Sequence, residues 1–266
     1  RGQPQRARGL GRGLQALLRR GDQARVVASQ ARIAGLGRFQ RARFERGAHG
    51  SRHGDAVAVQ DGEREVTLRR VGGVPLLYAG YHTVPGAHRD HAAVELVSII
   101  LADTPSGRLH QRLTEQRLAA GVFGFTEGLR DPGFLLLGAQ LTPEQDVAQA
   151  SQVLLETIES FATQPITQAE LDRARAKWLK DWDQGFADPQ HVGVALSEAV
   201  AQGDWRLFFL TRDRVRDIAL ADVQRVAATY LRGSNRTLGR YLPTVDPQRA
   251  PAPERVEVAQ ALKDFK

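Results

Sequence analysis

The sequence predicts an α+β fold, in which a largely antiparallel sheet carries helices packed on one face. Between residues 57 and 243 the expected strands come in consecutive pairs, the expected helices come in groups, and short turn signals join the paired strands. The expected order is β-β-α-α-β-β-α-α-α-α-β. Strict alternation of strand and helix, which would predict a parallel sheet, does not occur in this order.

The expected strands are short apolar runs bounded by turn residues. Gly72-Gly73 separates the first two strands, and Asp131-Pro132-Gly133 separates the next two. Because Pro presets φ and Gly tolerates positive φ, we expect both pairs to be joined as hairpins. The strands are expected at residues 65–70, 74–82, 121–129, 133–141 and 235–242.

The expected helices are recognised by apolar spacing near 3.6 residues and by capping residues at their starts. Ser106 is a candidate N-cap. Thr142 and Thr167 each precede a Gln or Glu by three residues, which is the spacing of a capping box. Asp188 followed by Pro opens a further helix, which Gly203 ends. The helices are expected at residues 89–102 (buried against the sheet), from 106, from 142, from 167, from 188 to 203, and at 220–231.

The positive charge of the chain is concentrated in residues 1–56, which contain thirteen Arg, no Lys and three acidic residues. This basic segment is rich in Arg and Gly and shows no pattern of a packed fold, so we expect it to be disordered or translated out of frame. Residues 57–243 are expected to form the α+β domain. Four Pro residues at 243, 247, 251 and 253 then mark residues 244–266 as a Pro-rich linker and tail.

Composition excludes several classes of protein. The chain has no Cys, which excludes disulfides, thiolate zinc ligands and a cysteine nucleophile. It has no apolar run of 18 residues, so no membrane span is expected. No Gly-rich phosphate-binding loop is present, and the basic segment lacks a recognisable nucleic-acid motif, so no specific nucleic-acid partner is expected. The absence of Met, even at position 1, indicates a processed product, an excised fragment or an incomplete reading frame.

The metal-ligand candidates of the sequence are His88, His91 and Glu95. His91 and Glu95 are four residues apart and share one face of an expected helix, and His88 lies three residues before His91. Such spacing occurs often by chance, and the Glu is not placed as a general base. We therefore predict no metal site and no catalytic residue in this chain. The three Trp residues at 178, 182 and 205 are expected in core or interdomain packing.

Two stretches carry a family resemblance: Gly203-Asp-Trp-Arg206 with Arg212-Asp213, and Ser234-Asn-Arg-Thr-Leu-Gly-Arg-Tyr-Leu-Pro243. Together with residues 60–70 and 104–117 they resemble the non-catalytic second domain of a long bacterial member of the insulinase/pitrilysin family of zinc metallopeptidases. The likeness covers about residues 60–266. Catalytic domains of that family carry an H-x-x-E-H helix, which no part of this sequence contains.

The resemblance implies a non-catalytic domain of a zinc-dependent metalloendopeptidase, a hydrolase of peptides, and implies that this chain is inactive alone. The domain would help to enclose and position peptide substrates beside a catalytic domain or subunit, in the periplasm, and zinc would belong to the missing catalytic domain. Arg236 and Tyr241 are the substrate-contact candidates, although a structural role is the simpler interpretation. Alternatives are a freestanding scaffold subunit of a catalytic peptidase, and a binder of nucleic acid or anionic surfaces that acts through residues 1–56.

Overall fold

The structure is a computed structural model that describes residues 60–265. The predicted basic segment 1–56 lies outside the described residues. Within them the fold is α+β, as predicted: one five-stranded mixed sheet, three of whose four strand pairings are antiparallel. The strands are β1 (Arg64–Val71), β2 (Leu76–His82), β3 (Gly121–Glu127), β4 (Phe134–Gln140) and β5 (Arg236–Thr244).

The strand order β1-β5-β2-β4-β3 corrects one of the two predicted hairpins. Strands β3 and β4 do form a hairpin, but β5 lies between β1 and β2 and pairs in parallel with β1. Gly72 and Gly73 have φ of +82° and +85° and make the turn between β1 and β2. Two strands that flank a third are about 10 Å apart, which the four residues 72–75 can span. The turn residues therefore could not reveal the inserted strand.

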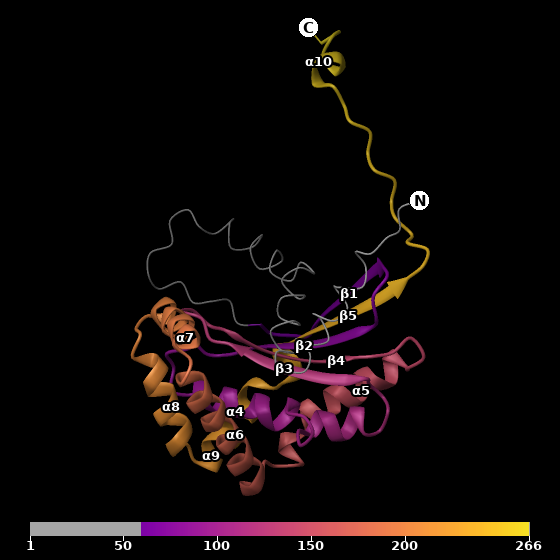
Figure 1. The fold of residues 1–266 in the computed structure, drawn as a ribbon. Helices are drawn as coiled ribbons and strands as arrows, with labels where there is room; N and C mark the ends of the chain where they lie inside the picture. Colours follow the sequence, from indigo (N-terminus) through magenta and orange to yellow (C-terminus); the bar gives the residue numbers. More distant parts are fainter. Residues whose placement is uncertain (1–59, 266) are drawn as a thin grey trace, which may run out of the picture.

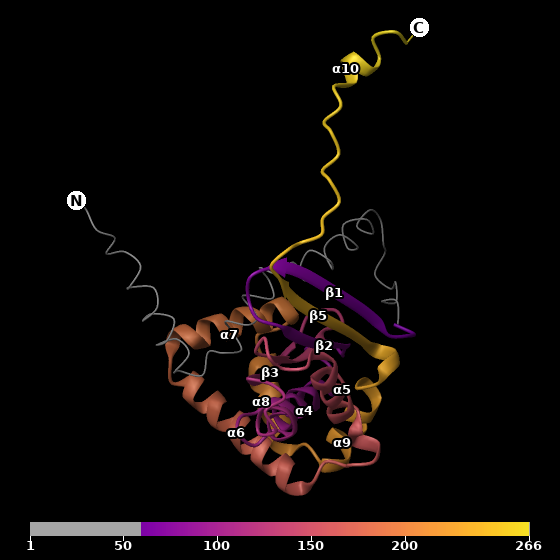
Figure 2. The ribbon, with the colours of Figure 1, turned by 90° about the vertical axis from the view of Figure 1, so that its right-hand side faces the viewer.

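Helices α4, α5, α6, α8 and α9 cover one face of the sheet, and α7 lies at the side of this layer (Figures 1 and 2). The core lies between that face and the helices. Leu77, Ala79 and Tyr81 of β2 point into it and are fully buried. The helices are α4 (His91–Ala102), α5 (Val147–Ile158), α6 (Gln168–Phe186), α7 (Pro189–Gln202), α8 (Leu207–Asp217), α9 (Leu220–Tyr230) and the short α10 (Val258–Ala261).

Two of the predicted helix starts are confirmed. Thr167 and Glu170 form the capping box of α6, each side chain accepting a hydrogen bond from the backbone N–H of the other. Asp188 caps α7, Pro189 is its first residue, and Gly203 ends it with φ of +138°. None of the described helices is both long enough and apolar enough to cross a membrane.

Other predicted helix details are wrong. The N-cap of α5 is Asp146, whose carboxylate accepts from Ala148 and Gln149, so Thr142 is not the cap. Gln145 still bonds the backbone N–H of Thr142, but only within the preceding turn. The Ser106 hydroxyl donates to Asp103 and caps no helix; a short helical segment with a π-helix at His110–Thr114 follows it.

Helix α8 was not predicted. It has no side-chain cap, and only Val215 among its eleven residues is buried, so neither of the usual sequence signals marks it. Its position depends on packing against α4, α6 and α7.

Candidate functional site

The structure does not bring the three metal-ligand candidates together. The Nδ1 atom of His88 accepts a hydrogen bond from the backbone N–H of Asp90, at 3.1 Å. His91 is buried at the first turn of α4, with its Nε2 atom 3.4 Å from Glu95. Among residues 60–265, no group of three or more His, Asp or Glu side chains is placed to hold a metal ion.

Glu95 instead joins three elements. Its carboxylate accepts hydrogen bonds from Thr126 of β3 and from the indole Nε1 of Trp178 on α6, the latter at 3.4 Å. With the His91 contact, both oxygens of Glu95 already have protein partners. The three metal-ligand candidates do not fit a zinc ion. The carboxylate oxygens of Glu95 already accept hydrogen bonds from β3 and α6, and the described residues do not bring three protein ligands together.

Arg236, a substrate-contact candidate, lies at the start of β5 and is almost fully buried. Its guanidinium donates to Glu63 at 2.7 Å and to Glu159 at the end of α5. The hydroxyl of Tyr81 donates to the same Glu159 oxygen at 3.0 Å. Burial, followed by the nearby Glu159 charge, raises the pKa of Tyr81, so this phenol stays protonated. Arg236 is thus held by two carboxylates, of which Glu159 connects β5 to the end of α5 and Glu63 connects β5 to the residue before β1.

Tyr241, the other candidate, lies on the opposite face of β5 from its neighbour Arg240, as the alternation of a strand predicts. Arg240 pairs with Glu65 of β1 at 2.8 Å. The Tyr241 hydroxyl donates to the backbone carbonyl of Gly72 at 2.9 Å, in the turn between β1 and β2. The two sequence candidates therefore do not form one site, since Arg236 and Arg240 share the helix side and Tyr241 is on the other side.

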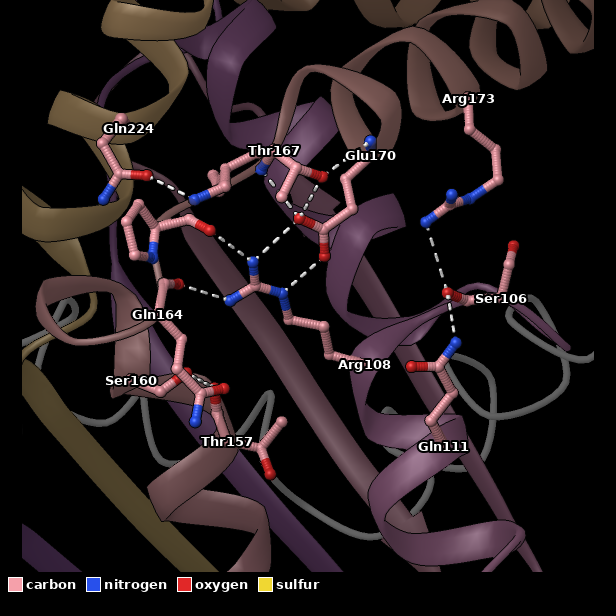
Figure 3. A network of polar contacts seen from close by, with 12 residues as sticks. Ser106, Arg108, Gln111, Thr157, Ser160, Gln164, Thr167, Glu170, Arg173 and Gln224 are labelled. Atoms are coloured by element: carbon pink, nitrogen blue, oxygen red, sulfur yellow. Dashed lines mark hydrogen bonds and ion pairs between the residues drawn. The ribbon is translucent and has the colours of Figure 1, made fainter.

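A groove of about 850 Å³, lined mainly by residues with polar or charged side chains, opens beside the end of α5. At its edge Arg108 makes the network shown in Figure 3. Its guanidinium donates to both oxygens of Glu170, at 2.6 and 2.9 Å, and to the carbonyls of Gln164 and Pro165. Arg108 thereby ties the segment after α4 to the connection between α5 and α6.

The charge on Glu170 is strongly favoured in this network. Burial alone would raise the pKa of its carboxyl, but hydrogen bonds from Arg108 and from Thr167 outweigh burial and lower the pKa to about 2. The Nε, Nη1 and Nη2 atoms of the Arg108 guanidinium each donate to an oxygen atom of the protein. The Arg108–Glu170 pair is therefore a structural connection at the edge of the groove.

The face of the sheet opposite the helices carries a second, smaller apolar cluster, which we call the open-face cluster. It is formed by Tyr78, Phe123 and Leu136, with Leu76, Phe125 and Phe134 partly buried around them. The rings of Tyr78 and Phe123 meet edge to face at 5.5 Å. None of helices α4–α9 covers this face (Figures 1 and 2).

A third apolar feature, which we call the aromatic cluster, joins α6 to α8. Trp182 stacks on Phe186 at 4.9 Å and on Phe208 at 5.1 Å, and the Phe209 ring contacts Trp205 at 6.0 Å. Arg212 lies over the Trp182 ring at 4.8 Å. Phe186 and Trp205 remain 48% and 52% exposed. Of the three Trp residues expected in core or interdomain packing, Trp178 packs against the core, Trp182 lies half-buried in the aromatic cluster, and Trp205 lies at the surface, where packing against another domain stays a prediction.

Sequence reasoning missed the three Phe residues of the aromatic cluster. The signals were the four-residue spacing of Trp182 and Phe186 on α6, and the Phe208-Phe209 pair that follows Trp205. Because α8 itself was not predicted, nothing placed that pair on the same surface as α6.

Comparisons with known proteins agree on one family. A family model described as the peptidase M16 inactive domain matches residues 41–177. The inactive peptidase domain of a candidate zinc protease from Bordetella parapertussis is 57% identical, with a TM-score of 0.63, over 70% of this chain and 99% of that one. The structure of a candidate zinc protease from Bordetella pertussis Tohama I is 55% identical, with a TM-score of 0.60, over 65% of this chain and 95% of that one.

A curated relative is longer than this chain. The zinc protease PqqE of Helicobacter pylori is 25% identical over 181 residues, which cover 67% of this chain and 40% of that protein. The chain thus corresponds to about two fifths of that relative.

Proposed function

Because the chain belongs to the peptidase M16 family and matches its inactive domain, we propose that it is the non-catalytic wall of a zinc metalloendopeptidase. In this proposal it packs beside a catalytic domain or subunit, which holds the zinc ion, and helps to enclose and position peptide substrates. The observation that carries the proposal is the 57% identity to an inactive peptidase domain over 99% of that domain. A periplasmic location belongs to the same proposal and rests on the resemblance alone.

The open-face cluster supports the enclosing role. A sheet face that none of helices α4–α9 covers, with aromatic side chains on it, offers an apolar surface to an extended peptide, and Tyr241 lies on the same face. We assign peptide contact to that face, with Tyr241 at its margin. Arg236 is assigned a structural role, because its guanidinium is held by Glu63 and Glu159.

The test begins with the coding DNA around this segment. An H-x-x-E-H domain encoded in frame with the chain is the expected partner of the wall domain. When the two are produced together, hydrolysis of an unfolded fluorogenic peptide should be at least about tenfold faster than with the catalytic domain alone, which corresponds to about 1.4 kcal/mol in the barrier. A Phe125→Ser variant should lose part of that gain, and a Gln168→Ser variant, changed on an exposed helix surface, should keep it.

The alternatives give different results. An H-x-x-E-H protein encoded only in a separate gene, and co-purifying with this chain, would favour the freestanding scaffold subunit. If no such domain is encoded, or if co-production changes neither binding nor hydrolysis, the proposal is wrong. Zinc-dependent hydrolysis by this chain alone would also contradict it.

A further inference from the structure

A row of cross-strand neighbours crosses the open face of the sheet, from a charged residue at one edge to the open-face cluster. The register of the strands places one residue of each strand side by side on this face: Arg64, Thr237, Gly80, Leu136 and Phe125. Leu136 and Phe125 belong to the open-face cluster, at one end of the row. Arg64 forms the other end, on the edge strand β1. The insertion of β5 between β1 and β2 is what aligns Arg64 with the cluster.

Arg64 brings an uncompensated positive charge to this face. Its side chain is exposed and makes no hydrogen bond or ion pair with another described residue. Its neighbour Glu65 pairs with Arg240 on the helix side, so the alternation of the strand places Arg64 on the open face. After burial, the charge of Arg64 contributes to lowering the pKa of His82, which lies on the same face of β2. The charge of Arg64 therefore acts across the open face.

The charges of this face are divided between its two edges. Arg70 also lies on the open side of β1, roughly 20 Å along the strand from Arg64. Glu127 lies on β3, at the opposite edge of the sheet. A peptide that binds along the row should therefore carry its acidic group at the β1 end, where the face is basic.

The length of the row matches the repeat of an extended peptide. Arg64 on β1 and Leu136 on β4 are three strand spacings apart, which is roughly 14 Å. In an extended peptide, side chains four residues apart point the same way and are about 13 Å apart. Between the two ends of the row lie Thr237 and Gly80, which are both small, so a peptide backbone can pass close to the sheet.

We propose that the open face selects extended peptides that carry a large apolar side chain and, four residues away, a carboxylate. The apolar side chain packs against the open-face cluster beside Phe125, and the carboxylate pairs with the guanidinium of Arg64. This inference rests on the proposed function, in which the open face contacts peptide, and it names the class of peptide. Arg64 is then a residue that determines specificity and takes no part in hydrolysis.

The test is the affinity of the full 266-residue chain for labelled peptides, measured by fluorescence anisotropy. The reference peptide has one Phe and one Glu four residues apart in a background of Ser and Thr. A second peptide of the same composition places the Glu next to the Phe, and a third replaces the Glu with Lys. The unchanged chain should bind the reference peptide about fivefold more tightly than the second, which is the upper range for an exposed ion pair, and should bind the third most weakly.

Charge reversal on β1 identifies the contact. Arg64→Glu should weaken binding of the reference peptide roughly 20-fold, because repulsion replaces attraction, and this variant should prefer the Lys peptide. Arg69→Glu makes the same charge change on the helix side of the same strand, so it should leave the order of the three peptides unchanged. Both variants keep residues 1–56 and have the same net charge, so attraction to the basic segment affects them equally. Phe125→Ser should weaken binding of the reference peptide about tenfold, since it removes an apolar contact.

Several results would overturn the inference. They are a chain that binds none of the peptides, equal affinities for all three, and an Arg64→Glu chain that orders the peptides as the Arg69→Glu chain does. These measurements need no catalytic partner, so they fail separately from the proposed function. If they fail while an H-x-x-E-H domain still hydrolyses peptide faster with this chain, the proposed function stands and the peptide class is wrong. If they succeed while co-production has no effect, the open face selects such peptides without serving a peptidase.

Discussion

The two faces of the sheet are built by the same five strands but are stabilised in different ways. On the helix face, side chains such as Leu137 are fully buried in one continuous core with α4 and its neighbours. On the opposite face, Leu136 belongs to the small open-face cluster, in which the aromatic rings pack against one another. The helix face therefore holds most of the apolar burial that stabilises the fold, whereas on the opposite face the apolar side chains pack in a small cluster that none of helices α4–α9 covers.

Leu136 and Leu137 are adjacent on β4 and allow the two faces to be compared with the same change. Leu137→Ala should lower the free energy of unfolding by about 3 kcal/mol, because it leaves a cavity in a closed core. Leu136→Ala should cost about half as much, since its surroundings can relax toward solvent. Urea unfolding of the two variants measures the difference. Equal losses would show that the open face is covered as completely as the helix face.

The Arg108–Glu170 network should be the most important polar contribution on the helix side. Glu170→Gln should cost about 2–3 kcal/mol at neutral pH, because it leaves the largely buried Arg108 guanidinium without its charge partner. Gln168→Glu, on the same helix turn but exposed and outside the Arg108 network, makes the opposite change in net charge and should stay within about 0.5 kcal/mol of the unchanged protein.

The same residue predicts a pH dependence. The folded pKa of Glu170 is lowered to about 2, below its unfolded value of about 4.3, so its contribution is fully present above the unfolded pKa. The contribution is lost as the pH falls from about 4.5 toward 2. Unfolding measured across this range should show the Glu170→Gln variant approaching the unchanged protein at low pH. A constant difference between the two would contradict the lowered pKa.

Two glycines test how tightly the open face is packed. A Cβ at Gly138 of β4 would lie 2.3 Å from the Phe123 ring and 2.5 Å from the Leu77 carbonyl, whereas a Cβ at Gly121 of β3 would meet nothing within 4 Å. Gly138→Ala should therefore cost about 1–2 kcal/mol, and Gly121→Ala should be close to neutral. Thermal unfolding of both variants is the measurement, and equal melting temperatures would mean that both the Phe123 ring and the neighbouring strand at Leu77 move aside freely.

The smallest expected effect concerns the start of α6. Thr167→Ala removes the capping-box hydroxyl and should cost about 1 kcal/mol. Thr163→Ala is the matched control, because its exposed hydroxyl donates only to the nearby Ser160 carbonyl. A loss equal to that of the control, in urea unfolding, would show that the cap contributes little to the native state.

Local signals in the sequence were sufficient for most elements. The strands, the buried α4 and the starts of α6 and α7 follow from spacing and capping, because these patterns depend on residues within one turn of each other. Helix α8 lacks both signals, and the cap of α5 was assigned four residues too early, because Thr142 with Gln145 offers the same local pattern as a true cap. The position of α8 is therefore set by packing against α4, α6 and α7, and the start of α5 is set by the Asp146 cap.

The features of the candidate site also divide into those that the sequence determined and those that only the tertiary structure decided. The sequence alone determined that no H-x-x-E-H motif is present, that the domain is α+β, and that Arg240 and Tyr241 lie on opposite faces of a strand. Only the tertiary structure decided that β5 enters between β1 and β2, that Glu95 bonds Thr126 and Trp178, and that Arg236 is held by two carboxylates. The reason is physical: spacing encodes the direction of a side chain along its own element, whereas its partner is chosen by contacts between residues far apart in the chain.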